Sequence, residues 1–170
     1  MKGDKGKTFS FAWKLLLDKN FKESGKFCHL HQIKLDGAGV GTPNLTLTAR
    51  SAMQLENENE ILAKVPIQSF RGEWVQIREK ITYGPKGCVD LTIDRMRDGY
   101  RLMSFSGCNV KLDNNGLMIR PKFGFYRSLE DTSSLRDESI KIVDLCIGEG
   151  DSCHYSSTGH SYTPKENLSS

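Results

Sequence analysis

One stretch of the sequence carries two cations, a glycine and a phenol at alternate positions. Strand geometry sends alternate residues to the same face, and that face would carry Arg120, Lys122, Gly124 and Tyr126. The two phenylalanines between them would then face the core. A glycine in a strand lets a ligand approach the backbone closely. The run from 120 to 127 is therefore a candidate binding or catalytic strand.

A second polar stretch contains two histidines two residues apart. His29 and His31 would share one face of a strand, whereas Gln32 and Lys34 would share the other. Two histidines at this spacing can bind a metal, but the sequence offers no third ligand at a suitable spacing. We therefore expect no metal and no cofactor, and we interpret the four side chains as part of a polar site.

Together the two stretches contain the residue types that β-elimination on a uronic acid requires. In that reaction the C5 proton is removed, the charge of the carboxylate is offset, and the O4 leaving group receives a proton. A phenol such as that of Tyr126 can make both proton transfers, because neighbouring Lys or Arg favours the phenolate and a histidine can share the work. Lys, Gln or His near the carboxylate stabilises the enediolate-like intermediate.

Other charged and aromatic residues are less specific. Arg50 and Arg78 end or interrupt strand-like runs and would extend a groove for a polyanion, together with Lys34 and Arg120, although exposed arginines on strands are common. The two tryptophans are typical of a core or a sandwich edge. The acidic run 56–60 is typical of a loop or a solvated face rather than a catalytic carboxylate pair.

Short alternating runs bounded by Gly, Pro, Asn and Asp predict an all-β protein, an antiparallel β-sandwich. A length of 170 residues is enough for one two-sheet domain, expected over 1–147, with a flexible C-terminal tail over 148–170. A short helical turn or functional loop is expected over 129–138. The predicted strands are 8–17, 27–35, 44–50, 61–66, 73–83, 88–95, 100–109, 122–126 and 139–147.

Charge and hydropathy exclude several classes of protein. The formal net charge is +3, the basic residues are interleaved with acidic ones, and no recognition motif appears, so we expect no nucleic-acid partner. The sequence contains no long apolar stretch, and we therefore expect neither a membrane span nor a signal peptide. We expect a monomer.

The five cysteines form no zinc-type motif. Their odd number leaves at least one thiol free. Cys146 and Cys153 flank a Gly-containing turn and could close a small loop in an oxidising compartment.

Several runs resemble polysaccharide lyases of the jelly-roll, concanavalin A-like fold, the relatives of heparin lyase I, glucuronan lyase and alginate lyase. These runs are HLHQIK from His29, LTLTAR from Leu45, WVQIRE from Trp74, IRPKFGFYRS from Ile119 and SLRDE from Ser134. The resemblance extends over about 8–147. It implies a jelly roll, an acidic polysaccharide as partner, β-elimination as the activity, and an extracellular location.

The resemblance also implies roles for individual residues. Alginate lyases of this fold carry a Gln-Ile-His strand and a Lys-x-Gly-x-Tyr strand; Gln32 begins a similar strand that has Lys34 in place of His, and Lys122 to Tyr126 matches the second. Tyr126 would be the base and acid, Gln32 would help neutralise the carboxylate, and Lys122 would support it. His31 is the nearest imidazole, although simple alternation places it on the opposite face from Gln32 unless a bulge shifts the register.

One element of such lyases has no counterpart. They usually carry an Arg-x-Glu strand ahead of the region that matches, and nothing before Thr8 resembles it. We expect either an N-terminally shortened copy or an incomplete groove. The alternative to a lyase is therefore a non-catalytic carbohydrate-binding jelly-roll module or a degenerate relative.

Overall fold

Alternation between apolar and polar residues determines which side of each strand faces the core. In β6 (Trp74–Thr82), Val75, Ile77 and Ile81 are buried, whereas the residues that alternate with this side, such as Gln76 and Lys80, are half-buried. The one polar residue on the buried side of this strand is Glu79, which is 2% exposed. Its partner in the opposite sheet is described with the candidate site.

The computed structural model describes residues 4–36, 43–58, 60–113 and 117–153. Within these ranges the other strands are β1 (Thr8–Leu17), β2 (Cys28–Asp36), β3 (Leu45–Ala49), β4 (Ala52–Asn57), β5 (Glu60–Pro66), β7 (Gly84–Arg95), β8 (Arg101–Leu112), β9 (Met118–Arg127) and β10 (Ile140–Glu149). Two short 3-10 helices, η1 (Ile67–Phe70) and η2 (Thr132–Ser134), lie in connections. No helix of the described residues is long and apolar enough to cross a membrane.

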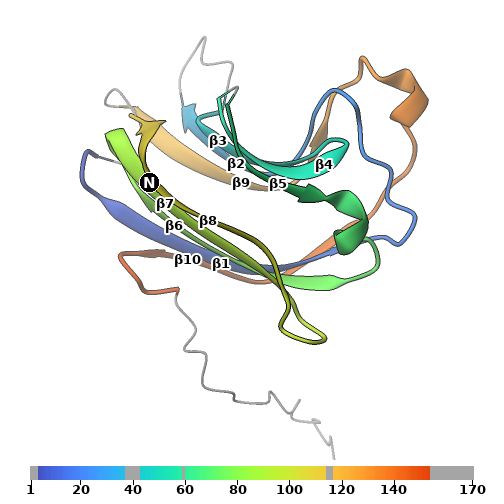
Figure 1. Cartoon of the computed structure of the whole chain (residues 1–170). Coiled ribbons are helices and arrows are strands. Elements are labelled where there is room, and N and C mark those ends of the chain that lie inside the picture. The colour runs from blue at the N-terminus through green and yellow to red at the C-terminus, as the bar shows by residue number, and fades with distance from the viewer. Residues whose placement is uncertain (1–3, 37–42, 59, 114–116, 154–170) are drawn as a thin grey trace, which may run out of the picture.

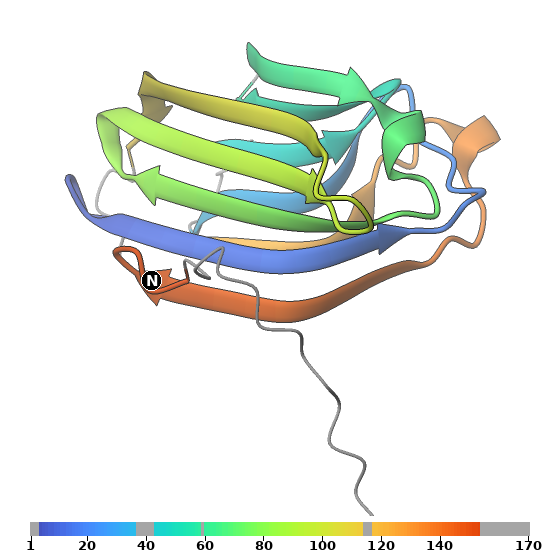
Figure 2. The same ribbon diagram turned by 60° about the horizontal axis from the view of Figure 1, so that its bottom comes forward.

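The strands form two antiparallel sheets of five strands each, in the orders β10-β1-β6-β7-β8 and β5-β4-β3-β2-β9. Figure 1 shows both sheets bent in the same direction, with the β5-β4-β3-β2-β9 sheet on the inside of the bend. We call this the inner sheet and the other the outer sheet. Figure 2 shows β10 at one side of the outer sheet and β8 toward the other. This is the all-β sandwich that the sequence predicts.

One continuous hydrophobic core fills the space between the sheets. Phe11 and Trp13 of β1 meet Leu47 of β3 and Ile77 of β6 among residues that are at most 1% exposed. Trp13 is therefore a core residue, as expected. Burying a large aromatic side chain of this kind contributes about 2–3 kcal/mol.

The strand β4 is the largest departure from the sequence-based expectation. The residues of β4, the last two of which begin the acidic run, were expected to lie outside the strands, yet Glu56 and Asn57 are buried within it. Glu56 faces Thr46 of β3 in the ladder and binds Arg50 through a 3.0 Å bond to its Nε. A partner for the carboxylate allows an acidic residue to be buried here.

The last strand also extends further than expected. β10 continues to Glu149, and the amide of Cys153 donates a 3.0 Å hydrogen bond to Ser10 Oγ of β1. The part of the expected tail from 154 onward lies outside the described residues.

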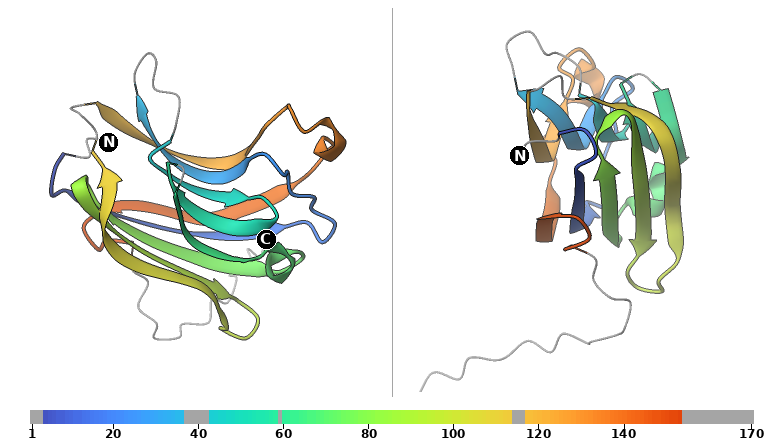
Figure 3. Two further views of the ribbon diagram at one scale, coloured as in Figure 1. Left: turned by 45° about the horizontal axis from the view of Figure 1, so that its top comes forward. Right: turned by 90° about the vertical axis from the view of Figure 1, so that its left-hand side faces the viewer.

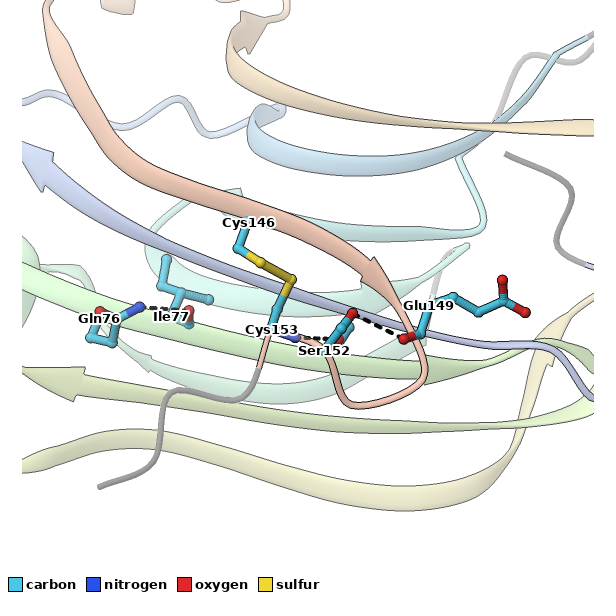
Figure 4. The surroundings of a disulfide bond; sticks show 7 residues. Gln76, Ile77, Cys146, Glu149, Ser152 and Cys153 are labelled. Atoms are coloured by element: carbon cyan, nitrogen blue, oxygen red, sulfur yellow. Dashed lines mark hydrogen bonds between the residues drawn. A yellow bond between two sulfur atoms is a disulfide. The ribbon is translucent and has the colours of Figure 1, made fainter. Parts of the chain in front are cut away.

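Two disulfides fasten the outer sheet. Cys146 and Cys153 are bonded, which closes the small loop that their spacing suggested, and Ser152 Oγ donates to the carbonyl of Glu149 inside that loop (Figure 4). Cys88 of β7 and Cys108 of β8 are opposite each other in the ladder and form the second bridge. Sequence spacing gave no signal for this pair, because their distance depends on the register of two strands.

Cys28 is the remaining cysteine, with a free thiol that is fully buried. Burial raises the pKa of this thiol to about 11, and the thiolate is the reactive species. We expect native protein to show no reaction with an aromatic disulfide reagent, the denatured protein to show one thiol, and the denatured and reduced protein to show all five. A Cys28→Ser variant should lose the single thiol of the denatured state. More than one thiol before reduction would show that a bridge is missing.

Candidate active site on the inner sheet

A β-bulge in β2 determines which histidine faces away from the core. His29 lies opposite Thr48 of β3, but His31 lies opposite Leu47, so β2 advances by two residues while β3 advances by one. The extra residue of β2 breaks the alternation. Leu47 belongs to the core, so His31 faces the core and His29 is turned to the open face with Thr48. Alternation alone had placed both histidines on one face.

The same irregularity continues into β9. His29 lies opposite Tyr126 and Gln32 lies opposite Lys122. Between these two pairs β9 has three residues, whereas β2 has two. Gly124 is one of the three and has φ +131°, a backbone conformation that L side chains rarely adopt. The bulge therefore brings His29, Gln32, Lys122 and Tyr126 to the same open face of the inner sheet.

The open face contains a hollow of about 300 Å³, which we call the lysine hollow. It is lined by Gln32, Lys34, Lys122, Phe123, Gly124, Phe125 and Tyr126. No carboxylate is among these residues, and no contact in the described chain pairs the Lys122 ammonium group. Tyr126 is 58% exposed, so its phenol is open to a ligand. Two cations, an amide and a phenol thus surround a space of the size that small ligands occupy.

His29 lies behind Tyr126 and is 9% exposed. Its ring stacks on Phe27 with centroids 4.8 Å apart, and its centroid is 6.2 Å from that of Tyr126. His29 Nδ1 lies 3.0 Å from Thr48 Oγ1, which also accepts the amide of Cys28 at 3.3 Å. Because this oxygen already accepts a bond, we assign its proton to His29 Nδ1, which leaves the imidazole proton on Nε2.

Arg120 and Arg50, two further residues that were expected to bind substrate, both have acidic partners. Arg120 lies opposite Lys34 in the ladder and binds Asp36 at 3.2 Å. Arg50 follows β3; it binds Glu56 and also donates to the carbonyl of Lys26, so its charge is largely balanced. It is close enough to His29 to lower the pKa of that imidazole.

Arg78 is not brought together with the other residues. It belongs to β6 of the outer sheet, and it alternates with the core residues Ile77 and Glu79, so its side chain points away from the core. Its guanidinium binds Asp94 of β7 at 3.2 Å. An arginine there cannot contact a ligand held on the inner sheet.

His31 is not in the lysine hollow either, because it is 1% exposed and lies between the sheets. Its Nε2 is 3.0 Å from Glu79 Oε2 of the outer sheet, and its Nδ1 is 2.9 Å from the backbone carbonyl of Lys122. The carbonyl can only accept, so Nδ1 carries a proton, and the bond to Glu79 holds a second proton. The pair is therefore neutral as a whole, and it links the outer sheet to the backbone of the strand that carries the lysine.

Two loops form a wall at one end of the inner sheet. The loop after β9, which contains η2, and the loop between β1 and β2 lie side by side (Figure 1, and Figure 3 in two further views). Asp131 joins them, since its carboxylate accepts hydrogen bonds from Ser24 Oγ, the Gly25 amide, Ser133 Oγ and Ser134 Oγ at 2.7–3.1 Å. These bonds, the one from Ser134 most of all, lower the pKa of Asp131 below its usual range.

Sequence reasoning missed Glu79 as part of this region and placed His29 only in a polar site together with His31. It raised a bulge as the way to bring a histidine and Gln32 to one face, but the pattern did not show which histidine would turn outward. A Glu in an alternating run carries no signal of its own. Within the described residues no cluster of His, Cys, Asp or Glu could hold a metal ion.

Several solved structures have a similar fold. An endo-β-1,4-glucuronan lyase from the fungus Trichoderma reesei has a TM-score of 0.63 and 14% identity, covering 86% of this chain and 70% of its own. A marine alginate lyase from Aplysia kurodai has a TM-score of 0.60 and 12% identity, covering 88% and 72%. An alginate lyase from Chlorella virus has a TM-score of 0.56 and 11% identity, covering 88% and 74%. The chain therefore shares the jelly-roll fold of these polysaccharide lyases. No family model and no curated protein sequence matches it.

Removing His31 alone should destabilise the protein. A His31→Leu substitution leaves the Glu79 carboxylate buried without a partner, which costs about 3–5 kcal/mol in the free energy of unfolding. The double substitution His31→Leu with Glu79→Leu should recover most of that loss, because no charge is then buried. Urea unfolding of the single and double variants measures both effects. Losses that simply add would show that the two side chains do not interact.

The buried His29 should make stability depend on pH. Burial, and then the charge of Arg50, lower its pKa to about 4, against about 6.5 in the unfolded chain. Below pH 6.5 the unfolded chain therefore binds a proton that the folded protein does not, and stability falls by about 3 kcal/mol as the pH falls to 4. Urea unfolding from pH 7.5 to 4 should show a shallower decline for His29→Gln. Equal declines in the two proteins would contradict this assignment.

Proposed function

We propose that the protein is a polysaccharide lyase that cleaves an acidic, uronic-acid-containing polysaccharide by β-elimination. The observation that carries the proposal is the exposed Tyr126 beside Gln32, Lys34 and Lys122 in a hollow without a carboxylate. The fold adds support, since solved neighbours include a glucuronan lyase and alginate lyases. Two further alginate lyase structures of this fold hold an alginate trisaccharide and an alginate tetrasaccharide.

The residues of the hollow suit the electron flow of this reaction. The Tyr126 phenolate takes the C5 proton, the electron pair of that bond forms the C4=C5 double bond, and the C4–O4 bond breaks. The resulting phenol then returns its proton to O4. General acid–base catalysis of this kind contributes about 10²–10⁴-fold.

The carboxylate of the uronate would be held by two different donors. The Lys122 ammonium group supplies charge, and the Gln32 amide supplies a hydrogen bond on the same face. Such donors stabilise the charge that the carboxylate gains when the C5 proton leaves. His29 does not line the hollow; its ring packs beside Tyr126, with centroids 6.2 Å apart.

A non-catalytic carbohydrate-binding module is the second candidate. A lyase needs neighbouring groups to align the Tyr126 hydroxyl, whereas a binding module does not. No hydrogen bond to this hydroxyl occurs within the described residues, which agrees with a binding module. The lysines would serve either function. We further infer an extracellular location, because the two disulfides persist best in an oxidising compartment.

Activity is tested by the ultraviolet absorbance of unsaturated uronates. The protein is incubated with glucuronan, alginate, heparin and pectate in turn, and we expect a rise with at least one of them. Tyr126→Phe keeps the ring but removes the hydroxyl, so it should lower the rate by about 10²-fold or more. Tyr100→Phe, also exposed but outside the inner sheet, is the matched control and should keep full activity. Binding without any rise in absorbance would favour the carbohydrate-binding module.

A further inference from the structure

Tyr126 stands between two hollows of different character. On one side is the lysine hollow. On the other is a more open depression, which we call the leucine hollow, lined by Phe125, Tyr126, Arg127, Leu129, Leu135, Arg136 and Asp137. Phe125 and Tyr126 line both hollows. A polymer bound across Tyr126 would therefore place neighbouring sugar units in the two hollows.

The leucine hollow exposes an unusual amount of apolar side chain. Leu129 is 77% exposed, Leu135 39% and Phe125 38%. The loop that carries the leucines is fixed by the hydrogen bonds that Asp131 accepts. Exposed apolar groups held in place beside a polar site are typical of a binding surface.

The two arginines that line the leucine hollow already have partners. The Arg136 guanidinium binds Glu138 at 2.6 Å and the carbonyl of Asn20. Arg127 is 8% exposed, donates to the carbonyls of Ser134 and Lys22, and packs against the Phe125 ring at 4.7 Å.

The exposed charged side chain of the leucine hollow that has no ion pair is negative. Asp137 is exposed and has no cationic partner within the described residues. Its carboxylate would repel a uronate, while the aliphatic side chains beside it give an anion no hydrogen bond. The lysine hollow has the opposite character, with two ammonium groups and no carboxylate. The two sides of Tyr126 are thus built for different sugars.

We infer that the leucine hollow binds an uncharged sugar with an apolar face, such as a 6-deoxy or O-acetylated unit, next to the uronate in the lysine hollow. This inference rests on the proposed function for the position of the polymer. The substrate is then a heteropolymer in which a uronate is linked to a neutral sugar, rather than a polymer of uronates alone.

The test compares two tetrasaccharides, one of four uronates and one in which uronates alternate with neutral 6-deoxy sugars. Binding is measured by calorimetry on the full chain carrying Tyr126→Phe, so that turnover does not interfere. We expect the alternating tetrasaccharide to bind at least about tenfold more tightly, a difference that corresponds to 1.4 kcal/mol. Leu129→Lys should shift the preference toward the four-uronate ligand. Leu145→Lys, at an exposed leucine of β10, is the matched control and should leave the preference unchanged.

The outcomes for the two proposals are separable. Equal or tighter binding of the four-uronate ligand, with no effect of Leu129→Lys, would overturn the neutral-sugar inference whether or not the protein is a lyase. A preference for the alternating ligand that Leu129→Lys reverses would support it. Absence of unsaturated product from the alternating polymer, with that preference intact, would reject the lyase and keep the sugar assignment.

Discussion

The candidate site depends on one change of register in the inner sheet. Side chains on a strand alternate with a period of two, so a single extra residue exchanges the two faces. In β2 that exchange occurs between His29 and His31. It gives one imidazole to the open face beside Tyr126 and the other to the core. Without the bulge, Gln32 and Lys122 would face outward with no histidine near the phenol.

The two imidazoles then have separate tasks. His29 accepts the Thr48 hydroxyl proton and packs beside Tyr126, whereas His31 joins Glu79 to the carbonyl of Lys122. A buried pair of this kind contributes little net stability compared with an apolar core, but it tolerates few other arrangements. The pair therefore fixes β9 against the outer sheet. The loop after β9, which carries the exposed leucines, borders the same strand at one end.

The sequence predicts the sandwich well because alternation is a local property. In β6 it marks the buried face residue by residue, and even Glu79 falls on the correct side. The same rule places Gln32 with Lys34, and Lys122 with Tyr126, on one face of each strand, but the meeting of the two pairs in one hollow follows from the pairing of β2 with β9. What alternation could not predict depends on contacts between strands. The bond between His31 and Glu79 joins residues 48 positions apart in different sheets, and the separation of Arg78 from the candidate site follows from the order of the strands.

The strand that carries Lys122 and Tyr126 is also the last strand of the inner sheet. An edge strand presents unpaired amides and carbonyls to any extended chain that meets it, which is the usual start of aggregation. Pro121 removes one donor from this edge, and the bulge at Gly124 interrupts the spacing of the groups that follow. The irregular backbone that directs side chains to the open face therefore also makes β9 a poor template for fibre growth.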